Sequence, residues 1–178
     1  MSEVNNRLGV AGYVVARAYR NNKFDEDGNL IELGEFLWEE RGPNIIPDVG
    51  ISHILQTCYT QEDAASAALY VGLLNNYTPV AGTTMANIGT NEITNYNEAA
   101  RQAYTGVESA KTASNTASPA SFTISAGGAV VYGAFLSDSS TKGGTTGLVL
   151  GAKLFASSRT LLEADVLNIT YAVTGSSS

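Results

Sequence analysis

The chain has 178 residues, of which 44% are hydrophobic and 15% charged, and its net charge is −7. This apolar content excludes a disordered chain and is enough for one domain with a core of its own. Lysines and arginines are spread singly along the acidic chain, which excludes a basic face for phosphate backbones, so we expect no nucleic-acid partner.

The N-terminal segment 1–7 has no continuous apolar stretch behind a basic start, so we expect no secretory signal. No run approaches the ~18 apolar residues of a membrane-spanning helix, and we expect no membrane partner. Both expectations favour synthesis and folding in a cytoplasm. The single cysteine, Cys58, excludes an internal disulfide framework and is predicted to be a buried structural thiol.

A β-hairpin is predicted for the N-terminal part of the chain. Residues 10–20 alternate with a period of two and predict a strand, and 35–41 predict its return strand, with Phe36 and Trp38 on one face. The intervening segment 25–29 contains Asp-Gly, whose glycine tolerates the positive φ of a tight turn. We expect this hairpin either to join the main fold or to extend to a neighbouring protein.

A helix of about three turns is predicted after the hairpin. Residues 42–44 and Pro47 interrupt the strand, and Asp48 is suited to cap the helix. One helix face is apolar and is expected to pack on a sheet; it comprises Ile51, Ile54, Leu55 and Cys58. His53 falls away from that face, and we expect it to be partly exposed and inert.

Further strands are predicted where apolar or alternating runs end in turn residues. They cover 67–74, 121–124, 129–136, 148–155 and 165–173. Between them we expect one helical turn within 81–91, a polar loop at 109–118, a mobile loop at 137–147 and a connection at 159–164. Residues 98–104 fit either a strand or a short helix, and we favour the strand.

Together these elements predict a mainly β fold, an antiparallel β-sandwich or jelly roll with an N-terminal β-hairpin and one short helix. Residues 1–60 form the hairpin and helix, which are part of the main fold or appended to it. Residues 61–178 form the sandwich. Its core is expected around Leu69, Val131, Leu148 and Ile169.

The residue types needed for catalysis are scarce. One histidine and one cysteine give almost no material for acyl transfer or a zinc site, so we expect no enzyme activity, no cofactor and no metal. Residues 25–29 lack the spacing of an EF-hand loop and fit a hairpin turn better. Glycosidase chemistry needs only two carboxylates; Glu92, Glu98 and Glu108 are the candidates, but their spacing does not single them out.

Low charge and abundant tyrosine favour a surface that contacts other proteins. No charged residue occurs from Ala64 to Asn91, and such a surface costs little to desolvate on contact. An ordinary neutral sandwich surface explains the composition equally well. Aromatic side chains suit protein or sugar contacts. The candidate interface residues are Tyr19, Phe36, Trp38, Tyr77, Tyr96 and Tyr104.

The order of several segments is similar to that of a known family. These segments are the Asp27-Gly28 turn leading to Trp38-Glu39-Glu40-Arg41, Pro43 to Ile46, Val49 to Leu55, Leu69 to Pro79, Ala117 to Phe122, Val131 to Leu136, Leu154 to Ala156 and Val166 to Tyr171. In them the chain resembles a family of small structural proteins of tailed-bacteriophage virions. The resemblance covers most of the chain, but its pieces are turns and strand cores, so it transfers no active site.

The resemblance implies a virion protein made in the host cytoplasm, with the outer capsid surface as its expected location. The expected function is that of a capsid decoration or cement protein, which binds the major capsid protein or other virion proteins and stabilises the assembled head. The weakly charged surface favours a homo-oligomer, a trimer or dimer. The alternatives are a neck, tail or fibre-base protein that binds a receptor or glycan, and a small carbohydrate-active hydrolase.

Overall fold

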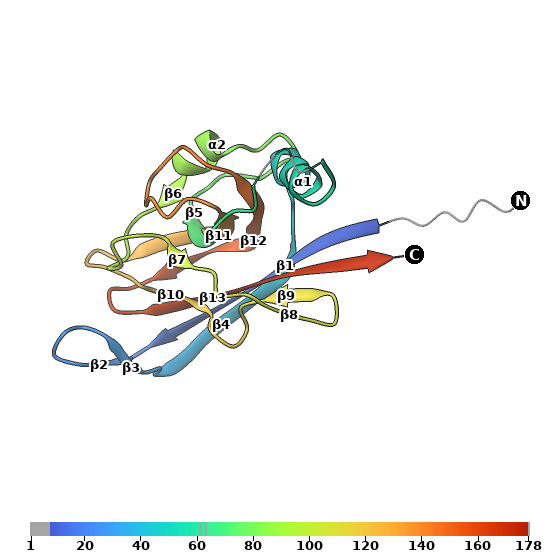
Figure 1. Cartoon of the computed structure of the whole chain (residues 1–178). Coiled ribbons are helices and arrows are strands. Elements are labelled where there is room, and N and C mark those ends of the chain that lie inside the picture. The colour runs from blue at the N-terminus through green and yellow to red at the C-terminus, as the bar shows by residue number, and fades with distance from the viewer. Residues whose placement is uncertain (1–7, 61, 63, 178) are drawn as a thin grey trace, which may run out of the picture.

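The protein is mainly β, and two antiparallel sheets pack against each other as a sandwich (Figure 1). The computed structural model describes residues 8–60, 62 and 64–177. The larger sheet has the order β4-β1-β13-β9-β8, with β10 also paired to β13. Its strands are β1 (Leu8–Arg20), β4 (Glu35–Asn44), β8 (Val107–Ser109), β9 (Thr112–Ser114), β10 (Ala120–Thr123) and β13 (Val166–Ser177).

The smaller sheet has the order β12-β11-β5-β6, with β7 also paired to β5. Its strands are β5 (Tyr70–Leu74), β6 (Glu92–Ile93), β7 (Gln102–Ala103), β11 (Ala129–Ser137) and β12 (Val149–Leu161). A separate two-stranded ribbon is formed by β2 (Lys23–Phe24) and β3 (Leu30–Glu32). The helices are α1 (Asp48–Leu55), which continues into the wider π-helical turn η1 (Gln56–Thr60), and α2 (Met85–Gly89).

The core lies between the sheets and uses the inward positions of alternating strands. The fully buried side chains of the larger sheet include Val14, Ala16 and Ala18 on β1 and Leu167, Ile169 and Tyr171 on β13. The alternation predicted for these two strands is therefore confirmed. Of the predicted core centres, Val131 and Ile169 are fully buried, whereas Leu69 and Leu148 are half-buried at the margin.

The N-terminal hairpin joins the sandwich. β1 pairs with β13 from Leu8 to Tyr19 and with β4 on its other side. Of the two expectations for this hairpin, the structure shows the one in which its strands belong to the main fold. The prediction that Gly42 and Pro43 end β4 is wrong, since both remain paired with β1. β4 is at the edge of its sheet, where a proline without an N–H need not remove a ladder hydrogen bond.

Three other predicted segments have different boundaries in the structure. The segment 109–118 is not a continuous loop, because β8 and β9 form a hairpin there, turned by Ala110 and Lys111 at φ values of 49° and 70°. Strand β12 runs through Arg159 to Leu161, so the predicted connection at 159–164 begins later. In 98–104 only Gln102–Ala103 is a strand.

Candidate interaction surface

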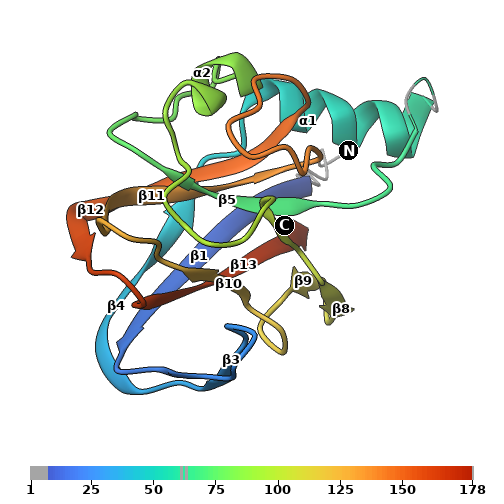
Figure 2. The same ribbon diagram turned by 90° about the vertical axis from the view of Figure 1, so that its left-hand side faces the viewer.

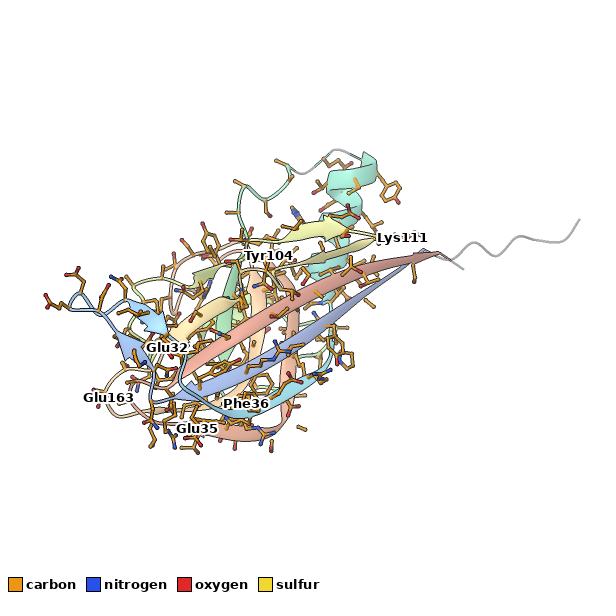
Figure 3. All side chains as sticks on the ribbon, turned by 90° about the horizontal axis from the view of Figure 1, so that it is seen from below. Glu32, Glu35, Phe36, Tyr104, Lys111 and Glu163 are labelled. Carbon is orange, nitrogen blue, oxygen red and sulfur yellow. The ribbon has the colours of Figure 1, made fainter. Side chains whose placement is uncertain are left out.

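Acidic side chains gather at one end of the molecule, around the β2–β3 ribbon. The exposed carboxylates there are Asp25, Glu26, Asp27, Glu32, Glu35 and Glu163. Figure 3 shows Glu32, Glu35 and Glu163 at this end, whereas α1 lies toward the opposite end. Figure 2 shows the same separation, with β3 and α1 at opposite extremes of the fold. We call the region of these six carboxylates the acidic end.

Asp25 shapes the tip of the ribbon. Its Oδ1 accepts the N–H groups of Asp27 (3.0 Å) and Asn29 (2.7 Å), and its Oδ2 accepts the Asn29 amide (3.0 Å). Hydrogen bonding by the Asn29 side chain, and then by these N–H groups, lowers the pKa of the Asp25 carboxyl. Gly28 has a φ of 83°, as the predicted turn requires. The tip is therefore an ordered turn, and its Asp25 carboxyl stays charged at neutral pH.

The opposite end carries large apolar side chains that the described part of the chain leaves exposed. α1 and η1 present Ile51, Leu55 and Tyr59 outward, with exposed fractions of 46%, 49% and 66%. Gly50 and His53 are the buried residues of α1, and Cys58 is exposed. The predictions of an inward apolar helix face, an outward His53 and a buried Cys58 thiol are therefore wrong.

Close contact through Gly50 accounts for this orientation. A β-carbon at Gly50 would lie 2.9 Å from the Val149 carbonyl oxygen, so the helix approaches β12 at a position where only glycine fits without adjustment. His53 follows three residues later on the same side, and its Nε2 lies 3.2 Å from the Ser66 hydroxyl. The larger apolar side chains consequently remain on the outer side.

A hollow of about 210 Å³ adjoins these outward side chains. Its lining combines the helix with β1 and the segment before α1, and consists of Val10, Ile46, Ile51, Ile54, Leu55 and Tyr59. We call this set the apolar face. Val10 is on the core side of β1, in line with Val14, but is 42% exposed because it lies beyond the end of the core. The hollow is thus the open, uncharged end of the sandwich.

Three of the sequence-predicted interface residues lie along β1 and β4. The rings of Tyr19 and Phe36 meet edge to face with centroids 5.9 Å apart, and Phe36 is 53% exposed. Trp38 is half-buried and packs edge-on against Phe155, with the Arg159 guanidinium 5.2 Å from its ring centroid. Tyr19 and Phe36 therefore form a small aromatic surface, whereas Trp38 mainly helps to join the sheets.

The other three predicted residues lie apart from that surface. Tyr77 is half-buried, and its hydroxyl lies 3.1 Å from that of Thr83. Tyr96 is buried against Phe122 in the core. Tyr104 is half-buried, and burial raises the pKa of its hydroxyl. The six candidates do not form one surface, and they do not include the apolar face, whose helical stripe was expected to pack inward.

The three candidate carboxylates do not converge on a common pocket. The Glu92 side chain is fully buried in a two-pronged ion pair with Arg101, at 2.9 and 2.7 Å. Glu98 accepts the N–H of Thr123 at 3.0 Å. Glu108 accepts the N–H of Lys111 at 3.0 Å, on an exposed hairpin. Each carboxylate therefore has its own local partner.

Arg101 also fixes the loop that was predicted to be mobile. Its guanidinium donates to the carbonyl oxygens of Ser139 (2.9 Å) and Gly144 (2.8 Å). Glu92 accepts the N–H of Gly143 at 2.8 Å. The ion pair thus anchors the loop between β11 and β12 to the body of the protein.

A polar groove of about 390 Å³ runs beneath the β2–β3 ribbon. Its lining includes side-chain amides, hydroxyls and one carboxylate, from Asn29, Asn97, Glu98, Gln102, Ser121 and Thr123. Phe24 lines an adjoining smaller hollow. Groups of these kinds can hydrogen-bond a polar ligand, and the ring can pack against its apolar side.

Comparisons with known proteins do not assign the chain to a family. No family model, curated protein or solved structure matches the chain. Within the described residues, no helix is long and apolar enough to span a membrane, and no cluster of three or more His, Cys, Asp or Glu could hold a metal ion. The candidate interaction surfaces are therefore the apolar face, the acidic end and the polar groove.

Proposed function

We propose that this chain is a non-enzymatic structural protein of a tailed-phage virion, a decoration or cement protein that binds the assembled head. The sequence resemblance suggests the virion. The observation that carries a binding role is the separation of the uncovered apolar face from the acidic end. An uncharged face can pack against other proteins without burying unpaired charge, and the acidic end remains hydrated.

The mechanism is stabilisation by linkage. A protein that binds only neighbouring capsid subunits in their assembled arrangement lowers the free energy of that arrangement by mass action. Contact with two subunits at once adds the gain from effective concentration. The β-sandwich supplies a rigid body for such a bridge, and its surface provides the contacts with the major capsid protein.

Copy number in purified particles tests this proposal. Particles from the genome that encodes the chain should contain it in hundreds of copies by gel densitometry calibrated with the major capsid protein. Particles lacking its gene should lose their DNA at a lower temperature than wild-type particles, and added purified protein should restore the difference. Absence of the chain from purified particles would refute a virion role.

A neck, tail or fibre-base protein that binds a glycan is the second candidate. The polar groove beneath the ribbon favours it, because amides and hydroxyls beside an aromatic ring suit a sugar. A few to a dozen copies per particle, with glycan-array binding that Asn97→Ala and Gln102→Ala abolish, would favour this candidate over decoration.

A carbohydrate-active hydrolase is the third candidate, and the separation of its three carboxylates argues against it. The test uses purified protein and cell-wall or surface polysaccharide. Hydrolysis that is lost in Glu98→Gln or Glu108→Gln would replace the structural proposal with an enzymatic one.

A further inference from the structure

The outer side of α1 and η1 carries a continuous row of exposed apolar side chains. Such a row differs from single apolar residues scattered over a surface, because it can form a contact with another protein. Ile51, Leu55 and Tyr59 are spaced four residues apart and lie on one side of the helix. An amphipathic helix of a globular protein normally buries such a stripe against its own core. Here each side chain is about half or more exposed and borders a hollow.

We infer that the apolar face binds the same face of a second copy of this chain, forming a two-fold dimer. Net charge restricts where two copies can meet, because each carries −7 and six of the nine exposed carboxylates among the described residues lie at the acidic end, whereas Asp48 and Glu62 are the exposed acids next to the helix. From residue 42 to residue 60 the only ionisable acid or base groups besides Cys58 and Tyr59 are Asp48 and the buried His53. Contact through the apolar face therefore brings together the surfaces that repel least and keeps the acidic ends apart.

The shape of the apolar face is also suited to self-association. A two-fold interface uses the same patch on both subunits, so the patch must offer both a projection and a recess. Tyr59 projects with 66% exposure, and the hollow of about 210 Å³ beside it is lined by Val10 and Ile46. Leu55 lies midway along the stripe. We place the two-fold axis there, so that Leu55 faces its own symmetry mate and each Tyr59 packs toward the partner's hollow.

This inference deepens the proposed function, and it rests on it only in assigning the apolar face to protein contact. Dimerisation is a property of the purified chain, whereas the virion role is measured by incorporation into particles. Particles can therefore contain a chain that is monomeric in solution, and a dimer can form in a chain that no particle contains. The two proposals can fail separately.

Light scattering of the purified full chain tests the dimer. We expect a concentration-dependent dimer, and its fraction should rise when NaCl increases from about 50 to about 500 mM, because salt screens repulsion between the acidic bodies. Leu55→Glu places two carboxylates at the axis and should weaken the dissociation constant by roughly 30-fold or more. The matched control is Leu162→Glu, since Leu162 is similarly exposed, at 54%, but lies near the acidic end.

A cross-link tests the position of the axis. In a Cys58→Ser background, Leu55→Cys should form an intermolecular disulfide under mild oxidation, because a residue at the axis faces itself. Leu162→Cys in the same background should not. A monomer at all accessible concentrations, a dimer that Leu55→Glu leaves intact, or a trimer would each overturn the inference. Circular dichroism of each variant establishes that a lost dimer is not a lost fold.

Discussion

The stability of the fold is expected to depend strongly on the buried charge of Arg101. Its side chain is fully buried, and so is that of its partner Glu92. The guanidinium also lies 5.1 Å from the Phe135 ring centroid and donates to two carbonyl oxygens of the β11–β12 loop. A buried pair of this kind does not guarantee net stability, but removal of one partner leaves the other charge without compensation.

We therefore expect Arg101→Met to lower the free energy of unfolding by about 3 to 5 kcal/mol. Urea titration followed by the fluorescence of Trp38, the single tryptophan, measures this change. Removal of both charges in Glu92→Leu with Arg101→Met should recover much of the loss, because no isolated charge then remains buried. The exposed pair of Lys23 and Glu32 provides the control, and Lys23→Met should have little effect. A double variant no more stable than Arg101→Met would contradict this explanation.

At the scale of elements, Glu40 joins the edges of the two sheets. It projects from β4, and its carboxylate accepts the Ala156 N–H on β12 (3.0 Å) and an Arg159 Nη2 donor (3.0 Å), with Lys153 at 4.0 Å. Burial raises the pKa of Glu40, but the Ala156 N–H and the two basic side chains outweigh it and hold the pKa below its ordinary value of 4.5. The contact between β4 and β12 therefore depends on an ionised carboxylate.

This dependence has a definite sign in pH. A carboxyl whose pKa is lower in the folded than in the unfolded protein stabilises the fold above the unfolded pKa, and this contribution is lost as pH falls through the folded pKa. We expect Glu40→Gln to be less stable than wild type at pH 7, with the difference shrinking below about pH 4.5. Thermal unfolding between pH 3 and pH 7 checks this. A difference that stays constant over that range would show that charge at Glu40 is not the cause.

The elements also show what sequence patterns can and cannot predict. Strands with strong alternation, such as β1 and β13, were predicted well because their pattern directly reports which side faces the core. The β8–β9 hairpin was missed because its turn uses Ala110 and Lys111 at positive φ, where glycine or asparagine would have been the signal. Continuation of β4 through Pro43 depends on its edge position, which no local pattern contains.

The candidate site was predicted less well than the fold, for a related reason. Periodicity identified the apolar stripe containing Ile51 and Leu55 but could not say whether a sheet or another protein covers it. The decisive residue is Gly50, whose missing side chain allows the other side of the helix to approach β12. The buried pair of Glu92 and Arg101 was not recognised either, because residues nine apart meet only after the chain folds.

At the scale of the whole molecule, we expect that the ribbon can be removed without loss of the fold or of dimerisation through the apolar face. Among the described strands, β2 and β3 pair with each other and with no other strand, and Arg20 pairs with Glu35 at the base of the ribbon. Removal of residues 23–33 would leave Asn21, Asn22 and Gly34 as a three-residue hairpin loop between them, a common length that often ends in glycine. The segment removed contains Lys23 and four acidic residues, Asp25, Glu26, Asp27 and Glu32, so the net charge changes from −7 to −4.

We expect the shortened protein to fold, with a thermal midpoint within about 5 °C of the full chain, because most of the core lies between the two sheets. Its dimer should be as strong as that of the full chain at high salt and stronger at low salt, since fewer like charges oppose association. Calorimetry and light scattering at two salt concentrations measure both effects. Weaker association of the shortened chain at either salt concentration would mean that the ribbon, rather than the apolar face, makes the contact. That outcome would move the binding surface to the acidic end.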